Sequence, residues 1–348
     1  MQSLGLKRRR QLPAAALALA VVACSLSTGW ARLASAEDAV VPAAAAAATV
    51  TTATPATGTP PADDLTEISI AAPEPRYVAP TRRDRIGRIW APVMINGKGP
   101  FRLVLDTGAS NSGIIAQVAT ALGLTPNEKS HVMLRGVTGS AVVPTVTVDN
   151  MSIGDLWITD SRLPIITDAL GGAQGIIGTK GLADKRVVID FRRDFISIRR
   201  SHGERAGYHF ITVPLRRSAN NLLVVDAMIG SVRTQAIIDT GGQISVGNSA
   251  LKDALLRRKR RGEDNIELVT GVTGDTQEGI GAKTPMISMG GLVVSGAYVT
   301  FGDMHIFEHW KLTSQPSILI GMDVLGLLDT LIIDYRLHEL QVLPRSEG

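Results

Sequence analysis

Apolar and polar residues alternate in short runs along most of the chain, and this pattern predicts strands rather than long helices. Strand-like apolar runs occupy residues 88–95 and 221–229. A turn-forming pair follows each run, Asn96-Gly97 in the first case and Gly230-Ser231 in the second. Two short helices are also expected, over residues 114–122 and 249–259. The pattern therefore predicts a mainly β protein.

The pattern of the first half of the chain recurs in the second half. Four segments match in the same order: Phe101–Ala109 with Thr234–Gly242, Arg135–Gly139 with Thr270–Gly274, Gly175–Gly178 with Ile318–Gly321, and Val187–Phe191 with Leu331–Tyr335. Because the spacing is also similar, we expect an internal duplication with two lobes related by a pseudo-twofold axis. The N-terminal lobe is predicted over residues 77–202 and the C-terminal lobe over residues 203–348. Each is expected to end with an apolar strand beside a glycine, a short helical turn and a final strand.

The start of the chain has the features of an export signal. A basic segment (Lys7–Arg10) precedes a short apolar segment (Pro13–Ala23), and a small-residue cleavage site (Ala34–Ala36) follows. Residues 1–36 are therefore predicted to be a signal peptide, which makes the protein exported, either periplasmic or secreted. The apolar segment is shorter than a membrane span requires.

A second interpretation of the leader stays open. The sequence that ends at Cys24 resembles the lipobox of bacterial lipoproteins, in which the cysteine is acylated and becomes the N-terminus. A retained N-terminal anchor is a third possibility. Residues 37–76 are rich in Ala, Thr and Pro and are predicted to be a disordered tether. Cys24 is the single cysteine, so no intramolecular disulfide is expected.

The tripeptide Asp-Thr-Gly occurs once in each half of the chain, at 106–108 and at 239–241. A single copy after a strand would be an ordinary turn. Here both copies follow an apolar strand at the same place in the repeat, which indicates a shared function. Two carboxylates held close together cannot both ionise easily, so such a pair shares one proton. One carboxylate then acts as a base toward water and the other as an acid toward a carbonyl oxygen, without metal or cofactor.

These motifs resemble those of the retropepsin-like and pepsin-like aspartic peptidases, which share hydrophobic-hydrophobic-Asp-Thr-Gly, a glycine-rich flap and a later apolar-apolar-Gly segment. The resemblance extends from about Tyr77 to Pro344 and implies a two-lobed acid-protease barrel fold with short helices. It makes Asp106 and Asp239 the catalytic pair. It assigns the support of this pair to Thr107, Gly108, Thr240 and Gly241. It places flap tips at Gly136, Val137, Thr138 and Gly139, and at Gly271, Val272, Thr273 and Gly274.

The resemblance implies an aspartic endopeptidase that needs no cofactor and acts on polypeptides. Because one chain supplies both motifs, the active species is expected to be a monomer, with a possible lipid anchor as its contact with a membrane. A peptide-binding module of the same fold, with weak or no catalysis, is the alternative. The second motif departs from the usual pattern at Gly242-Gln243, and neither flap contains a tyrosine.

Other candidate sites are weaker. His305 and His309 are spaced like two metal ligands on one helix face, but the sequence between them favours packing or a surface position, and no metal site is predicted. The basic run 257–261 lacks interleaved aromatic residues, so we interpret it as a solvated helix end rather than a nucleic-acid site. Asp190 and Asp334 recur on the final strands, where structural hydrogen bonds are the expected role.

Overall fold

The computed structural model describes residues 77–80, 90–218, 222–256 and 265–345. These residues all belong to one compact unit of the chain, Ile70–Gly348. The predicted signal peptide, Cys24, the predicted tether and the basic run 257–261 lie outside the described residues. Within the described ranges, no helix is long and apolar enough to cross a membrane.

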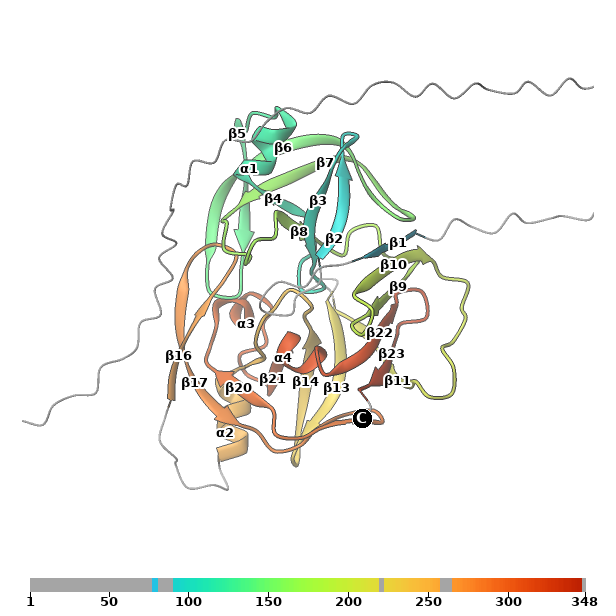
Figure 1. Ribbon diagram of the computed structural model, residues 1–348. Coiled ribbons are helices and arrows are strands. Elements are labelled where there is room, and N and C mark those ends of the chain that lie inside the picture. The colour runs from blue at the N-terminus through green and yellow to red at the C-terminus, as the bar shows by residue number, and fades with distance from the viewer. Residues whose placement is uncertain (1–76, 81–89, 219–221, 257–264, 346–348) are drawn as a thin grey trace, which may run out of the picture. The chain divides into compact units, whose positions relative to one another are not determined.

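The described chain is mainly β, and three sheets contain nearly all of its regular structure (Figure 1). This confirms the expectation of an acid-protease fold. One sheet is formed by the first half of the chain, one by the second half, and the third by strands from both halves.

The first half forms a seven-stranded sheet. In spatial order its strands are β2 (Trp90–Ile95), β3 (Lys98–Leu105), β8 (Gly175–Ile177), β4 (Gly113–Ile115), β7 (Leu156–Ile166), β6 (Ser140–Ile153) and β5 (Asn127–Arg135). The turn between β2 and β3 has positive φ at both Asn96 and Gly97, as the sequence predicted for this pair. Alternate residues of β2 are buried, because one face of the strand lies on the core.

The second half forms the largest sheet. Its strands in spatial order are β16 (Asn265–Thr270), β17 (Thr276–Lys283), β20 (Tyr298–Phe301), β15 (Val246–Gly247), β21 (Ser317–Ile320), β14 (Val232–Ile238), β13 (Leu223–Ile229), β18 (Ile287–Met289) and β19 (Leu292–Val294), with β12 (Arg216–Arg217) paired to β13. In each half, the strand that precedes Asp-Thr-Gly pairs in parallel with the later apolar strand, β3 with β8 and β14 with β21.

The third sheet contains strands from both sides of the predicted boundary at residue 202. Its order is β1 (Tyr77–Pro80), β10 (Phe195–Arg200), β9 (Lys185–Asp190), β22 (Leu328–Asp334), β23 (Glu339–Pro344) and β11 (Ile211–Pro214). Its central pair, β9 and β22, is antiparallel and joins the two halves (Figure 1). Val187, Ile189, Leu331 and Ile333 are buried on these two strands, so the joint is part of the apolar core.

The helices differ from the sequence prediction in three places, the start of α1, the stretch after Gly178 and the unpredicted helix α3. Helix α1 (Ala116–Leu122) begins later than expected, because Ile114 and Ile115 are buried and extend strand β4 between β7 and β8. In the second half, α2 (Ser249–Leu256) lies within the expected range, and α4 (Met322–Leu325) forms the short helical turn after β21.

The corresponding stretch of the first half contains no helix. It is a series of turns in which Gly181 has a φ of 87°, a conformation that does not continue a helix. Each half then ends in two strands rather than one. Helix α3 (His305–His309) was not predicted at all.

Candidate active site

The two Asp-Thr-Gly motifs lie in loops at the ends of β3 and β14. The Asp106 N–H donates to the Ile177 carbonyl oxygen (2.9 Å), and the Asp239 N–H donates to the Ile320 carbonyl oxygen (3.0 Å). The N–H of each aspartate thus continues the hydrogen-bond ladder of the parallel strand pair before it, β3 with β8 or β14 with β21. The apolar sheets therefore fix where each aspartate leaves its strand.

The two loops are held together by their threonines. The Thr107 hydroxyl donates to the Ile238 carbonyl oxygen, and the Thr240 hydroxyl donates to the Leu105 carbonyl oxygen, both at 2.6 Å. Each hydroxyl oxygen also accepts a hydrogen bond from the N–H of the other threonine, at 3.2 Å and 3.1 Å. Both threonines are buried. This reciprocal arrangement fixes the two loops against each other.

Each carboxylate is oriented by its own loop. Oδ1 of Asp106 accepts the N–H groups of Gly108 (2.9 Å) and Ala109 (3.0 Å). Oδ1 of Asp239 accepts the N–H groups of Gly241 and Gly242, both at 3.0 Å. The position after each Asp-Thr-Gly therefore provides a backbone donor, although neither residue has a side-chain hydroxyl.

The glycines of the motif allow the two carboxylates to approach each other. A Cβ atom on Gly241 would lie 2.3 Å from Cγ of Asp106, and a Cβ on Gly108 would lie 2.9 Å from Oδ1 of Asp239. Side-chain atoms do not approach so closely, so each loop requires glycine where it passes the carboxylate of the other. The two predicted catalytic residues, distant in sequence, are brought together by these loops.

The pair is poised to retain a proton. Burial, followed by the charge of Asp239, raises the pKa of Asp106 to about 8. A hydrogen bond with the Asp239 side chain acts in the same direction, whereas the bonds from Gly108 and Ala109 act against it. Asp239 is buried, and Asp106 retains partial contact with solvent. Near neutral pH the pair therefore holds one proton and one negative charge.

The apolar-apolar-Gly segments pack directly behind the aspartate loops. A Cβ on Gly178 would lie 2.5 Å from the backbone of Asn111, and a Cβ on Gly321 would lie 2.6 Å from the Ile244 carbonyl oxygen. The two glycine N–H groups donate to the hydroxyls of Ser112 (3.2 Å) and Ser245 (3.1 Å). These serines were missed in the sequence, although each lies six residues after its aspartate.

The predicted flap residues form the tips of two hairpins that contact each other. Residues 136–139 join β5 to β6, and residues 271–274 begin the turn that joins β16 to β17. The Thr138 hydroxyl donates to the Asp275 carbonyl oxygen (2.7 Å), and a Cβ on Gly271 would lie 2.4 Å from the Thr138 oxygen. Helix α3 supports the first tip, because the Ile306 N–H donates to the Val137 carbonyl oxygen (3.1 Å).

The two histidines of α3 lie beside the first hairpin. Nε2 of His305 is hydrogen-bonded to the Ser140 hydroxyl (2.6 Å). Burial, with Arg135 and His305 nearby, lowers the pKa of His309. Among the described residues, no group of three or more His, Cys, Asp or Glu side chains is arranged to hold a metal ion.

Asp190 and Asp334 make the structural hydrogen bonds expected of them. Asp190 accepts the N–H of Arg193 (2.8 Å). Asp334 is buried at the joint between the halves, where it accepts the hydroxyl of Ser201 and a guanidinium N–H of Arg186 (3.0 Å). They belong to the framework that supports the site.

Tyr335 is a neighbour of the site that the sequence did not reveal as one. Its side chain is completely buried, and its hydroxyl has no hydrogen-bond partner in the described part of the chain. Burial raises the pKa of this phenol, and the nearby Asp106 carboxylate adds to the shift. Tyr335 lies in the turn after β22, so the sheet that joins the halves also contributes to the surroundings of Asp106.

Comparison with known proteins agrees with this geometry over the first half of the site. No curated protein matches the chain in a sequence search. A family model described as aspartyl protease matches residues 91–180, a segment that contains Asp106, the first hairpin tip and Gly178. This match supports an aspartyl protease family for the chain.

Proposed function

We propose that the protein is an aspartic endopeptidase in which Asp106 and Asp239 together activate a water molecule. The observation that carries this proposal is the pair of adjacent carboxylates, each fixed by two backbone N–H groups, with the pKa of Asp106 raised to about 8. Two acids in such positions destabilise a fold, and a module that only binds peptides does not need them. This argues against the inactive alternative.

The proposed reaction follows from the single shared proton. The charged carboxylate removes a proton from water while the protonated one donates its proton to the carbonyl oxygen of the scissile amide. The oxygen of the water bonds to the carbonyl carbon, which gives a tetrahedral intermediate. Its collapse breaks the C–N bond as the protonated carboxyl gives its proton to the amine nitrogen, while the charged carboxylate takes a proton from a hydroxyl of the intermediate, whose oxygen becomes the new carbonyl oxygen. The pair ends with one proton and one negative charge, as it began.

The raised pKa of Asp106 assigns the first acid role. Because Asp106 keeps its proton up to about pH 8, it is placed to protonate the carbonyl oxygen, and the Asp239 side takes the proton from water. We infer a bell-shaped rate profile that extends from mildly acidic pH toward neutral pH.

The biological setting is part of the proposal. The basic and apolar segments of residues 1–36 support export, followed by cleavage near Ala36 or acylation at Cys24. The substrates would then be periplasmic, surface or secreted polypeptides. Both aspartate loops come from one chain and contact each other through Thr107 and Thr240, which supports a monomeric enzyme.

Digestion of a denatured proteome tests the activity. The purified protein should generate new peptide termini that mass spectrometry detects, and Asp106→Asn should generate none. New termini in equal number from the variant would identify a contaminating protease. If folded wild-type protein produced no new termini between pH 4 and pH 8, the peptide-binding alternative would replace the proposal.

A further inference from the structure

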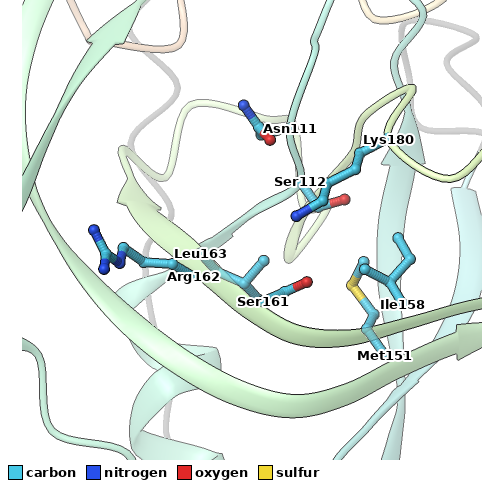
Figure 2. Close-up of a pocket in the computed structure, with 8 residues that line it drawn as sticks. All are labelled: Asn111, Ser112, Met151, Ile158, Ser161, Arg162, Leu163 and Lys180. Atoms are coloured by element: carbon cyan, nitrogen blue, oxygen red, sulfur yellow. The ribbon is translucent and has the colours of Figure 1, made fainter.

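A small pocket lies behind the Asp106 loop, on the first half of the chain (Figure 2). Asn111, Ser112 and Lys180 line it from the loops, and Ser161 and Arg162 line it from β7. The pocket is open to solvent on one side, and its enclosed part has room for a group of about the size of one water molecule. Only a small polar group, such as one end of a small ligand, therefore fits inside it.

The second half of the chain shows what binds at the equivalent place. Ser245 lies six residues after Asp239, as Ser112 lies six residues after Asp106. The Ser245 N–H donates to one carboxylate oxygen of Asp323 (2.9 Å), and its hydroxyl donates to the other (2.8 Å). The serine therefore holds a carboxylate with two donors at once. Asp323 also keeps contact with solvent.

Ser112 has the same surroundings without the carboxylate. Its hydroxyl oxygen accepts the Gly178 N–H, as the Ser245 oxygen accepts the Gly321 N–H. Within the described residues, neither the N–H of Ser112 nor its hydroxyl hydrogen meets an acceptor. Ser112 is only 5% exposed, and a buried donor without a partner is unfavourable. A carboxylate would satisfy both donors.

The residue at the position of Asp323 is Lys180, two residues after Gly178. The backbone is the same in both places: the Lys180 N–H donates to the Ser110 carbonyl oxygen (3.2 Å), and the Asp323 N–H donates to the Gln243 carbonyl oxygen (3.1 Å). The first half thus has a cation where the second half has the anion. Figure 2 shows Lys180 beside Ser112, and Arg162 pointing away from it.

The charge of the pocket favours an anion. No acidic side chain of the described residues lines it, whereas Lys180 and Arg162 are both exposed cations at its edge. We propose that this pocket binds a small free carboxylate, which occupies the place that the Asp323 side chain takes in the second half. The two oxygens accept the N–H and hydroxyl of Ser112, and Lys180 balances the charge. This site does not depend on the proposed peptidase activity.

Thermal unfolding of the full-length protein with sodium acetate tests the site. A ligand that binds only the folded state raises the melting temperature in a saturable way. Acetamide has the same shape without charge, and sodium chloride matches the ionic strength, so neither should reproduce the shift. The measurements belong at pH 7, where acetate is ionised.

Two variants locate the binding. Lys180→Met should weaken acetate binding about tenfold or more, the effect of losing one charge-assisted hydrogen bond. Lys180→Asp should place a carboxylate beside Ser112 and abolish the acetate effect. Lys129→Met, an exposed lysine outside the pocket, is the matched control and should leave the shift unchanged.

Three results would overturn the proposal. The first is no acetate shift in the wild type. The second is an equal shift with acetamide. The third is an acetate shift that neither Lys180 variant reduces. If Lys180→Asp failed to fold, the dissociation constant measured with Lys180→Met would decide.

Discussion

At the scale of single residues, the contacts that position the two aspartates also control their charge. The backbone donors of Gly108 and Ala109 stabilise a charged Asp106, but burial and the neighbouring Asp239 outweigh them. Gly108 and Gly241 allow the two carboxylates to come this close, because each glycine leaves room for the aspartate of the other loop. The surroundings therefore hold an acid in its neutral form at a pH where a free carboxyl would be ionised.

The stability of the protein should reflect this shifted pKa. The folded state holds the Asp106 proton more tightly than the unfolded state, where the pKa is near 3.8. The tighter proton binding by folded Asp106 adds to the free energy of unfolding. This contribution is fully present below pH 3.8 and is lost as the pH rises toward about 8. Asn at position 106 cannot titrate. As the pH increases, the free energy of unfolding of Asp106→Asn should therefore rise relative to that of the wild type, by at most about 1.4 kcal/mol per pH unit.

Urea unfolding from pH 4 to pH 8 measures this difference. Asp168→Asn, which changes an exposed carboxylate in a loop, is the control and should track the wild type. A constant difference between Asp106→Asn and the wild type over this range would contradict the assigned pKa.

At the scale of elements, the sequence predicted the strands and turns well, because their signals are local. The turn at Asn96-Gly97 and the strands before Asp-Thr-Gly follow from alternation and glycine position. The hairpin tips at 136–139 and 271–274 were expected from the resemblance to aspartic peptidases. Ile114 was wrongly assigned to a helix because its strand β4 is defined by partners distant in sequence. Helix α4 has no counterpart in the first half, where the positive φ of Gly181 is incompatible with a right-handed helix.

The candidate site was predictable only in part for a similar reason. Asp106, Asp239 and their threonines carry a repeated motif, so the sequence identifies them. Ser112, Ser245 and Asp323 contribute through hydrogen bonds between residues 66 to 78 positions apart in the sequence. Lys180 and Asp323 each lie two residues after a glycine, Gly178 or Gly321, but carry opposite charges, so the sequence does not suggest that they correspond. Their correspondence is evident only in the folded protein, where both residues make the equivalent backbone hydrogen bond.

The contact between the two aspartate loops should be stabilised by the hydroxyls of Thr107 and Thr240 rather than by the volume of these side chains. Thr240→Val keeps the shape but leaves the Leu105 carbonyl and the Thr107 N–H without partners in a buried place. We expect a loss of about 2–5 kcal/mol in the free energy of unfolding. Thr240→Ser keeps the hydroxyl and should lose about 1 kcal/mol, for one buried methyl group.

Urea unfolding of both variants gives the free energies, and cleavage of a reporter peptide gives the effect on turnover. Turnover should fall sharply in Thr240→Val and little in Thr240→Ser. Equal losses of stability in the two variants would mean that packing, not the reciprocal hydrogen bonds, holds the loops together.

At the scale of the whole described unit, a shared sheet and a buried ion pair join the two halves. Arg186 of β9 bonds Asp334 of β22 at 3.0 Å, and both side chains are almost fully buried. The same guanidinium also donates to Gln341 (2.8 Å) and to the Glu204 carbonyl oxygen (2.9 Å). The network therefore fixes both halves and the segment between them.

Removing one partner of this pair should be costly. Arg186→Met leaves the Asp334 carboxylate buried without its cation, and the free energy of unfolding should fall by about 3–5 kcal/mol. Adding Asp334→Asn removes the buried charge and should restore part of that loss. Equilibrium unfolding of the single and double variants measures this coupling, and a double variant as unstable as the sum of the two single changes would contradict it.

A covalent link between the halves also predicts behaviour on dilution. Because both aspartate loops belong to one chain, specific activity should stay constant from micromolar to nanomolar enzyme. Light scattering should report a monomer over the same range. A dimer that loses specific activity on dilution would show that the functional pair forms between chains instead.

The most direct test of the proposed mechanism is the turnover number of Asp106→Asn, Asp239→Asn and the double variant on one peptide substrate. Because the two carboxylates act on one shared proton, each single change should remove essentially all turnover, and the double change should remove no more. Circular dichroism and unfolding curves should show that all three variants remain folded. Near-normal turnover in either folded single variant would contradict the account.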